Sequence, residues 1–293
     1  YLPYCDPSGG LCAQASHFVK SSLNLAAADS KGPYAISQGN VSTAGVVDYT
    51  SAAISPIPPE WQSPFGNNSL LTWNCCLSIG SRTAHGPAAF AFNPSNMGSV
   101  SPNNSTYPMP PAPSVPLLYY DDAHMTVGNA NSVWDGVNNF YNAVLVPSYH
   151  GMVIPNGTRS ALYFTGMAMG TPVYGGTDCA NQHGYTAPPY QYWMVGYDLD
   201  NLAASSANPV TNPPWSTKPY GAWKLSGVIP FTDSTCDTHL GGAAYDSVNQ
   251  IIYVVAINND SLAQYGNGPI IYAWKVNAGP ADTQAPSVPT GLV

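Results

Sequence analysis

Charged side chains are scarce in this sequence. Only 8% of its 293 residues are Asp, Glu, Lys or Arg, whereas roughly 25% is usual in globular proteins. The seven basic residues are never adjacent, and the formal net charge is −8 at pH 7. Because nucleic acids and anionic membrane surfaces attract clustered Lys and Arg, the sequence argues against both kinds of partner.

Long apolar runs and clear helical patterns are also missing. No stretch of 18 apolar residues occurs, so we expect no membrane-spanning helix. The opening YLPYCDPSGG lacks the basic and apolar regions of a signal peptide, so we expect a processed terminus or a start inside a longer polypeptide. The 29 Pro and 27 Gly residues separate short apolar strands, which is typical of an all-β protein.

One order of strands recurs along the chain. Residues 241–277 read as a small-residue inner strand, a turn at Asp246–Asn249, a buried strand and an outer strand. Residues 150–201 repeat this order with a turn at Pro155–Thr158, and residues 85–122 begin in the same way. The repeat predicts an all-β, β-propeller-like fold whose ring this chain need not complete, with a two-sheet β-sandwich as the alternative. The predicted blade-like units lie near 61–122, 140–231 and 238–278.

The end of the chain differs from the rest. Residues 279–293 are rich in Pro and predict an extended tail or linker after a propeller-like domain of residues 1–278. Within them, APSVPTGL resembles the lead into the first strand of a fibronectin type III module. An extended tail stays ordered only when it packs on something, so we expect it to contact this domain, a neighbouring copy or another module.

Several strings occur in a fixed order: PPEWQSPFG, NCCLSIGSRTAHGPAAFAFNPSN, PLLYYDDAH, GTRSALYF, YQYWMVGYDL and GGAAYDSVNQIIYVV. Together, over about residues 15–277, they resemble the C-terminal portion of a group of secreted bacterial proteins with a propeller-like pattern and no assigned activity. The resemblance implies a fold and a secreted location, and no catalytic residue. It also implies that the chain begins part-way round the ring. The loop 173–185 departs from the group, with one Cys where the relatives have two, which puts a shared disulfide at Cys179 in doubt.

Three histidines stand just before predicted inner strands: His85, His150 and His239. Equivalent positions of successive blades meet at one mouth of a propeller channel, and three imidazoles there would suit Zn, Cu, Fe or Ni. The alternative is that each ring fills space and hydrogen-bonds a backbone carbonyl. His239 is offset by one residue from the other two, which weakens the metal interpretation.

Carboxylates are few, with one Glu (Glu60) and fourteen Asp. Asp121 and Asp122, followed by His124, would suit an acid–base pair or a Ca²⁺ site. Asp198 and Asp200 alternate in the predicted strand. For all of these we favour capping of turns through side-chain to backbone bonds. The sequence also lacks the nucleophile elbow, zinc-protease, Walker and dinucleotide motifs, so it favours a protein without catalysis and implies no firm cofactor.

The cysteines are interpreted as structural. Cys5 and Cys12 bracket the turn sequence DPSGGL, and two others lie in Asp/Thr-rich loops that could join two blades. The adjacent Cys75 and Cys76 would form either a strained vicinal disulfide with each other or two disulfides to different partners on opposite faces of a strand. Sequence alone does not choose among the fifteen connectivities. The six candidates are Cys5, Cys12, Cys75, Cys76, Cys179 and Cys236.

Six Asn-x-Ser/Thr sequons accompany the cysteines and favour a secreted, extracellular or cell-surface glycoprotein. They lie at Asn40, Asn67, Asn103, Asn104, Asn156 and Asn259.

Tyr and Trp combine with Pro in three predicted loops, at 107–113, 185–193 and 212–223. Exposed aromatic faces anchor sugars and protein partners, whereas the alternative is that they only stiffen the loops. The candidate binding residues are Tyr190, Trp193, Trp215 and Tyr220.

These observations predict a secreted, non-enzymatic structural or adhesive protein. It would be a subunit of an extracellular fibre or surface assembly, with its tail added to the sheet edge of another copy or of a neighbouring module. One alternative is a metal-dependent polysaccharide lyase or hydrolase using the histidines, and another is a lectin-like carbohydrate-binding module.

Overall fold

The computed structural model describes part of the chain, and every structural statement below concerns that part. It comprises residues 4–5, 12–13, 17–20, 22, 24, 29–36, 53–73, 88–96, 111–119, 148–168, 173–174, 185–186, 190–225, 229, 240–260 and 268–276.

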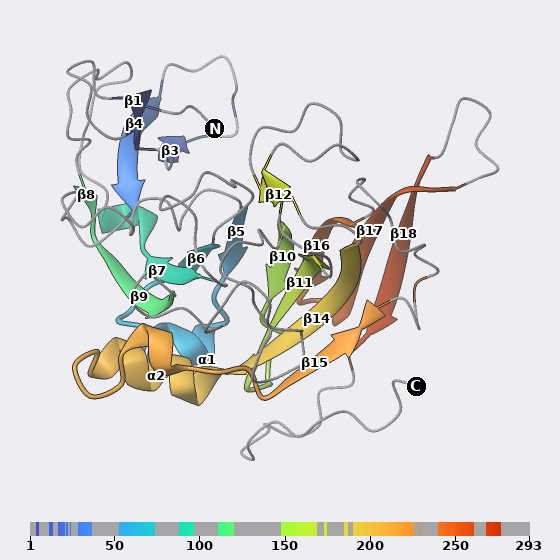
Figure 1. The fold of residues 1–293 in the computed structure, drawn as a ribbon. Helices are drawn as coiled ribbons and strands as arrows, with labels where there is room; N and C mark the ends of the chain where they lie inside the picture. Colours follow the sequence, from blue (N-terminus) through green and yellow to red (C-terminus); the bar gives the residue numbers. More distant parts are fainter. Residues whose placement is uncertain are drawn as a thin grey trace.

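Three antiparallel sheets dominate the fold, and in each the chain visits neighbouring strands in sequence order (Figure 1). The first sheet consists of β5 (Ala53–Pro56), β6 (Leu70–Trp73), β7 (Ala89–Phe92) and β9 (Ser114–Leu118). The second consists of β10 (Ser148–Val153), β11 (Ser160–Ala168), β14 (Tyr190–Asp198) and β15 (Gly221–Lys224). The third consists of β16 (Leu240–Asp246), β17 (Ile251–Asp260) and β18 (Gly268–Lys275). The prediction of an all-β protein is confirmed.

Shorter elements accompany these sheets. Helix α1 (Pro59–Gln62) joins β5 to β6, and helix α2 (Leu199–Ala207) follows β14 directly. Two 3₁₀ turns are η2 (Pro94–Asn96) and η3 (Pro214–Ser216). The remaining strands are β1 (Tyr4–Cys5), β2 (Cys12–Ala13), β3 (His17–Lys20), β4 (Ser30–Ile36), β8 (Pro111–Ala112), β12 (Val173–Tyr174) and β13 (Tyr185–Thr186). Among them β4 and β8 pair in parallel.

The second sheet is buried on both faces, and its sequence shows why. Along β11, Ala161 and Tyr163 belong to a core shared with the first sheet. Leu162 and Phe164, which point the other way, pack in a core shared with the third sheet. A strand with two buried faces needs an almost continuous apolar run, and the sequence ALYF supplies it. The two-sheet sandwich considered as an alternative has one core between its sheets, whereas the described residues form two cores.

The first strands of the sheets meet where β10 passes β16. A Cβ placed on Gly151 of β10 would lie 2.5 Å from the backbone nitrogen of Ala243 in β16. Real Cβ atoms do not approach backbone this closely, so only glycine allows the two strands to come together here. The close contact between β10 and β16 therefore depends on the absence of a side chain at Gly151.

Two details of the sequence interpretation are corrected. The strand after His85, β7, is the third strand of its sheet, whereas β10 and β16 are first strands; the three histidines therefore do not precede equivalent strands. The segment after Asp198 forms α2, although the sequence shows almost no helical periodicity. Only Leu199, Leu202 and Ser205 of α2 are buried, and a helix this short carries too brief a pattern to stand out.

Candidate functional site

The three sheets converge on the turn between β10 and β11. This turn runs from Pro155 to Thr158, with a hydrogen bond from the Thr158 nitrogen to the Pro155 oxygen (3.3 Å) and a φ of 72° at Gly157. Positive φ at the third position makes it a type II turn, which favours glycine there. The position of this turn determines what lies at the junction of the sheets.

Helix α1 of the first sheet holds this turn from outside. The Glu60 carboxylate accepts a hydrogen bond from the Gly157 nitrogen at 2.8 Å, and the Trp61 indole donates to the Thr158 carbonyl at 3.0 Å. Pro at the start of α1 suits a first helical turn, where its missing N–H would have no partner. Two side chains of one helical turn therefore fasten the first sheet to the second.

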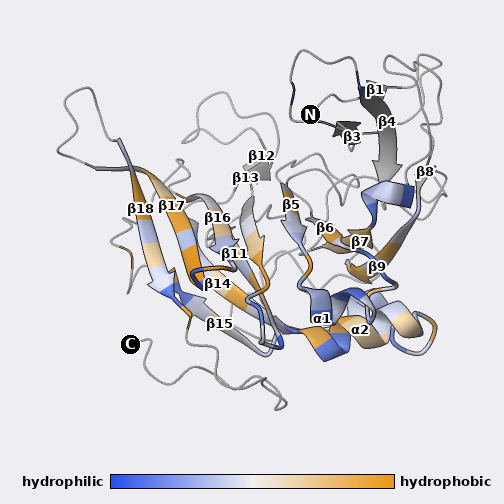
Figure 2. Ribbon diagram, turned by 180° about the vertical axis from the view of Figure 1, so that it is seen from behind, coloured by the Kyte–Doolittle hydropathy of each residue, from blue (hydrophilic) through white to orange (hydrophobic). Residues whose placement is uncertain are grey.

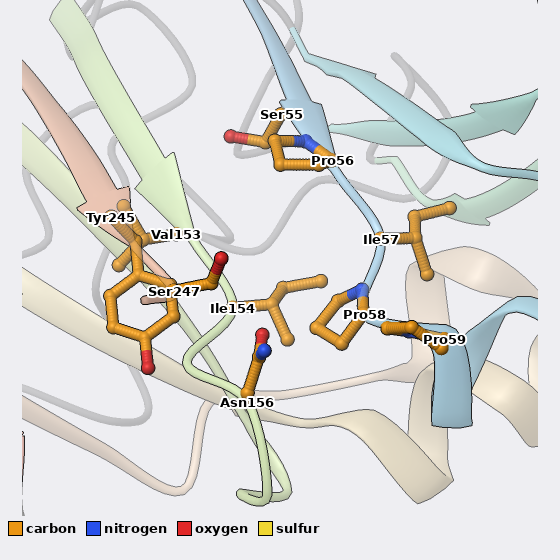
Figure 3. Close-up of a pocket in the computed structure, with 10 residues that line it drawn as sticks. All are labelled: Ser55, Pro56, Ile57, Pro58, Pro59, Val153, Ile154, Asn156, Tyr245 and Ser247. Atoms are coloured by element: carbon orange, nitrogen blue, oxygen red, sulfur yellow. The ribbon is translucent and has the colours of Figure 1, made fainter. Parts of the chain in front are cut away.

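A pocket of about 140 Å³ lies beside the turn (Figure 3). Each of the three large sheets supplies part of its wall: the segment from β5 to α1, the end of β10 with its turn, and the end of β16. Its ten lining residues are Ser55, Pro56, Ile57, Pro58, Pro59, Val153, Ile154, Asn156, Tyr245 and Ser247.

The polar groups of the pocket are all neutral. Ser55 donates its hydroxyl hydrogen to the Met152 oxygen at 2.5 Å, so its lone pairs remain. The hydroxyl of Tyr245 is buried without a hydrogen-bond partner in the described part of the chain. In the view of Figure 3, the amide of Asn156 and the hydroxyl of Ser247 lie between the rings of Tyr245 and Pro58. The Tyr245 hydroxyl is closed to solvent, so the hydrogen-bonding groups that a ligand in the pocket can reach are those of Asn156 and Ser247.

Charge gathers in a different place, where β14 passes into α2. Arg159 donates to both carboxylate oxygens of Asp198, at 2.8 and 3.1 Å from Nη2, and forms an ion pair of 2.6 Å with Asp200. Asp198 also caps α2 by accepting the Asp200 amide hydrogen at 3.1 Å. The expectation that Asp198 caps backbone N–H groups is confirmed, and the carboxylate serves structure.

The third sheet has a second apolar surface, which we call the open face: Ala244, Ile251, Tyr253, Val255, Ile257, Ile271 and Ala273. The strand register places all of these residues except Ile257 opposite or next to one another on β16, β17 and β18, and Ile257 lies two residues after Val255 in β17. Neither core of the described residues includes them, and Ile271 is 63% exposed. Figure 2 shows hydrophobic residues running along β17 and β18.

Only one of the three histidines of the predicted metal site lies among the described residues. His150 lies in β10, inside the strand rather than before it, while His85 and His239 lie outside the described residues, as do Asp121, Asp122 and His124. Within the described ranges, no three His, Cys, Asp or Glu residues lie close enough together to hold a metal ion.

The predicted disulfide and glycosylation sites are also divided. Cys5 and Cys12 lie directly opposite each other in the β1–β2 pair. Asn67 is exposed in the turn after α1, Asn156 lines the pocket, and Asn259 lies in β17. The other candidates lie outside the described residues: Cys75, Cys76, Cys179, Cys236, Asn40, Asn103, Asn104 and the tail 279–293.

Three of the four predicted aromatic binding residues have partners inside the protein. Trp193 and Trp215 are half-buried and pack against the core between the first and second sheets. Tyr220 covers Gly196, where a Cβ would lie 2.6 Å from its ring, and donates its hydroxyl to Ser160 at 2.9 Å. Tyr190 begins β14. For these three side chains the contacts favour packing, the alternative left open by the sequence.

Comparisons of the chain with protein-family models, with curated proteins and with solved structures gave no match. No helix among the described residues is long and apolar enough to cross a membrane.

Sequence reasoning missed the pocket and the two hydrogen bonds from Glu60 and Trp61 of α1 to the β10–β11 turn. Ser247 stands far from Ser55 and Glu60 in the chain, and no motif links the three residues. The PPEW string around Glu60 was the only available signal, because Pro-Pro-Glu before Trp favours the start of a short helix.

Proposed function

We propose that the chain is a secreted, non-enzymatic structural protein that assembles through the open face of its third sheet. The observation that carries this proposal is the similarity between the open face and the buried faces of the same molecule. On the second sheet, aliphatic and aromatic side chains on both faces are covered by neighbouring sheets. The open face presents the same kinds of side chain, with Ile271 63% exposed.

In this proposal the three sheets are consecutive blades of an incomplete β-propeller. The support is that each sheet is an antiparallel run in sequence order and that the first strand of the second sheet, β10, lies beside both β5 and β16. Blades pack face to face around an axis, so a terminal blade has one face left over. A further sheet, from a second copy or a neighbouring extracellular module, would cover it.

The energetics favour such a contact. Full burial of one exposed Ile or Val contributes roughly 1.5–3 kcal/mol, and the open face offers one exposed isoleucine, Ile271, beside partly buried aliphatic side chains. The resemblance to secreted propeller-like proteins and the tail 279–293 support the extracellular setting and a second link between subunits.

Light scattering of the full chain over a range of concentrations tests the proposal. We expect association that is lost in Ile271→Asp, because a carboxylate on the open face would have to be buried. Val248→Asp is the matched control: Val248 is 88% exposed, lies in the β16–β17 turn, and is not part of the open face. A full chain that stays monomeric at every concentration with its tail intact contradicts the proposal.

A further inference from the structure

The pocket at the junction of the sheets is built on rigid parts. Pro56, Pro58 and Pro59 form one wall, and proline has a fixed φ and little conformational freedom to lose. The opposite wall is the β10–β11 turn, which the contacts from Glu60 and Trp61 hold in place. A preformed site of this kind binds a ligand without the cost of ordering its own residues.

Its size suits one small ring. Small-molecule sites for larger ligands enclose roughly 300–1,000 Å³, and this pocket has about 140 Å³. Since a water molecule occupies roughly 30 Å³ in the liquid, the space would hold a few waters or a single ring, and not an extended chain.

The chemistry of the walls defines the ligand further. The ten described residues that line the pocket include no Asp, Glu, Lys, Arg or His, so neither a metal ion nor a phosphate would find a compensating charge. The hydroxyl of Ser247 and the amide of Asn156 can each donate and accept, whereas Ser55 can only accept, because its hydrogen is bound to the Met152 oxygen. The remaining wall is aliphatic. A ligand with several hydroxyl groups on an apolar, uncharged ring complements this arrangement.

We infer that the pocket binds one neutral sugar ring, with its hydroxyls on Asn156 and Ser247 and its C–H face on Pro58 and Ile154. The inference is independent of the proposed assembly, because the open face lies on β16, β17 and β18 and shares no residue with the pocket.

Two sources can supply such a ring. One is a free sugar or the end of a glycan on another molecule. The other is the first residue of a glycan on Asn156 itself, since Asn156-Gly157-Thr158 is a sequon. In that case Nδ2 of Asn156 forms a bond to C1 of the sugar. The bond from C1 to the diphosphate oxygen of a lipid-linked oligosaccharide donor breaks, the lipid diphosphate leaves, and the amide proton passes to the base of the transferase.

The first arm of the test uses unglycosylated full chain and the free sugars N-acetylglucosamine, glucose and galactose. We expect saturation-transfer signals and a Kd of about 1–10 mM for at least one of them, as suits a ligand this small. Ser247→Trp, which fills the pocket, should weaken binding at least tenfold. The control Val248→Trp changes the neighbouring residue of the same turn, which does not line the pocket, and should stay within twofold. If Ser247→Trp lowers the melting temperature, Ser247→Val replaces it.

The second arm uses protein secreted by a eukaryotic host that transfers N-linked glycans, trimmed to the first sugar. We expect NMR contacts between the sugar on Asn156 and the Tyr245 ring, and a lower melting temperature in Asn156→Gln. Asn67→Gly is the control, because Asn67 is exposed at a φ of 60° that glycine tolerates, and its loss should leave the melting temperature unchanged.

A result in the first arm identifies a free ligand, and a result in the second identifies the protein's own glycan. The inference is overturned if no sugar binds, or binds equally to Ser247→Trp, and the sugar on Asn156 makes no contact with Tyr245. If light scattering shows no association of the full chain, the proposed assembly fails, but both arms of the sugar test are unaffected. The assembly and the sugar pocket can therefore be disproved separately.

Discussion

The carboxylate of Glu60 accepts a hydrogen bond from the backbone nitrogen of Gly157, 97 residues away in the chain and 2.8 Å away in space. Glu60 is the only glutamate in the sequence. Its contact joins the helix of the first sheet to a turn of the second, and that turn carries Asn156 into the pocket. A residue with no recognisable motif thus helps to shape the candidate site.

Replacing Glu60 tests this contact. Glu60→Ala should lower the free energy of unfolding by about 1 kcal/mol, the usual net worth of one hydrogen bond, and should speed hydrogen exchange at the Gly157 amide. Glu60→Gln keeps an acceptor oxygen and should lose less on both measurements. Equal losses in the two variants, with no change at Gly157, would contradict the role assigned to Glu60.

Asp198 should matter far more to stability than its neighbour Asp200. Asp198→Ala removes the cap of α2 and leaves Arg159, only 16% exposed, without its bidentate partner, so we expect a loss of about 2–4 kcal/mol in urea unfolding. Asp200 is 56% exposed, and Asp200→Ala should cost at most about 1 kcal/mol. Similar losses from both changes would show that the ion pair to Asp198 carries no special weight.

Gly151→Ala should destabilise the protein although Ala is the smallest possible side chain. Its Cβ would lie 2.5 Å from backbone in β16, so the two strands must separate, and we expect a loss of about 1–3 kcal/mol. Val248→Ala, in an exposed turn, should change stability by less than about 0.5 kcal/mol. Thermal unfolding of both variants measures the difference, and an unchanged Gly151→Ala variant would show that β10 and β16 are not in close contact.

The turn at Asp246 should weaken in acid. The Asn249 backbone N–H, followed by its side-chain amide, the Val248 N–H and the charge of Lys275, hold the pKa of Asp246 below its ordinary value of 3.8. A lowered pKa in the folded state means that the stabilisation is present above the unfolded pKa and disappears as the pH falls through the folded one.

The comparison with Asp246→Asn isolates this effect, since the amide oxygen keeps an acceptor but carries no charge. The stability advantage of the natural chain should be constant from about pH 5 to 7 and shrink below about pH 4, as measured by urea midpoints across this range. An advantage that stays constant or grows in acid would give the opposite sign and exclude the assignment.

Cys5 and Cys12 should form a disulfide in the protein purified from an oxidising compartment. Directly opposite residues of antiparallel strands have Cα atoms about 4.5 or 5.5 Å apart, and bridged cysteines span about 4.4–6.8 Å. Peptide mapping without reduction should recover one cross-linked fragment containing both residues. Alkylation of either cysteine before reduction would rule out the pairing.

Part of the fold could be predicted from short-range patterns. The turn at Asp246–Asn249 and the strands on either side of it follow from an aspartate that binds its own backbone and from apolar runs bounded by turn residues. The prediction that the strand after His85 is an inner strand was wrong: β7 resembles the first strands of the other sheets in sequence but is the third strand of its own sheet. Strand patterns identify a strand and its buried faces, but not its place in the sheet.

The candidate site was beyond the reach of such patterns. Ser55, Asn156 and Ser247 come from three sheets and share no spacing, and Glu60 acts on a turn 97 residues away. Trp193 and Trp215 looked suited to ligand binding by their Pro-rich surroundings, yet they pack on a core. Composition alone does not distinguish an aromatic ring that faces solvent from one that a neighbouring sheet covers.

An all-β chain with few charges, with apolar strands and with turns set by Asp, Pro and Gly could be predicted from the residues alone. These properties depend on local conformation and on the period of the side chains. The packing of the sheets, in contrast, sets which strand comes first in each sheet, requires that Gly151 lack a side chain, and brings neutral polar groups from three sheets around one pocket. Those features depend on contacts between residues distant in the chain, which are settled when the sheets pack against one another.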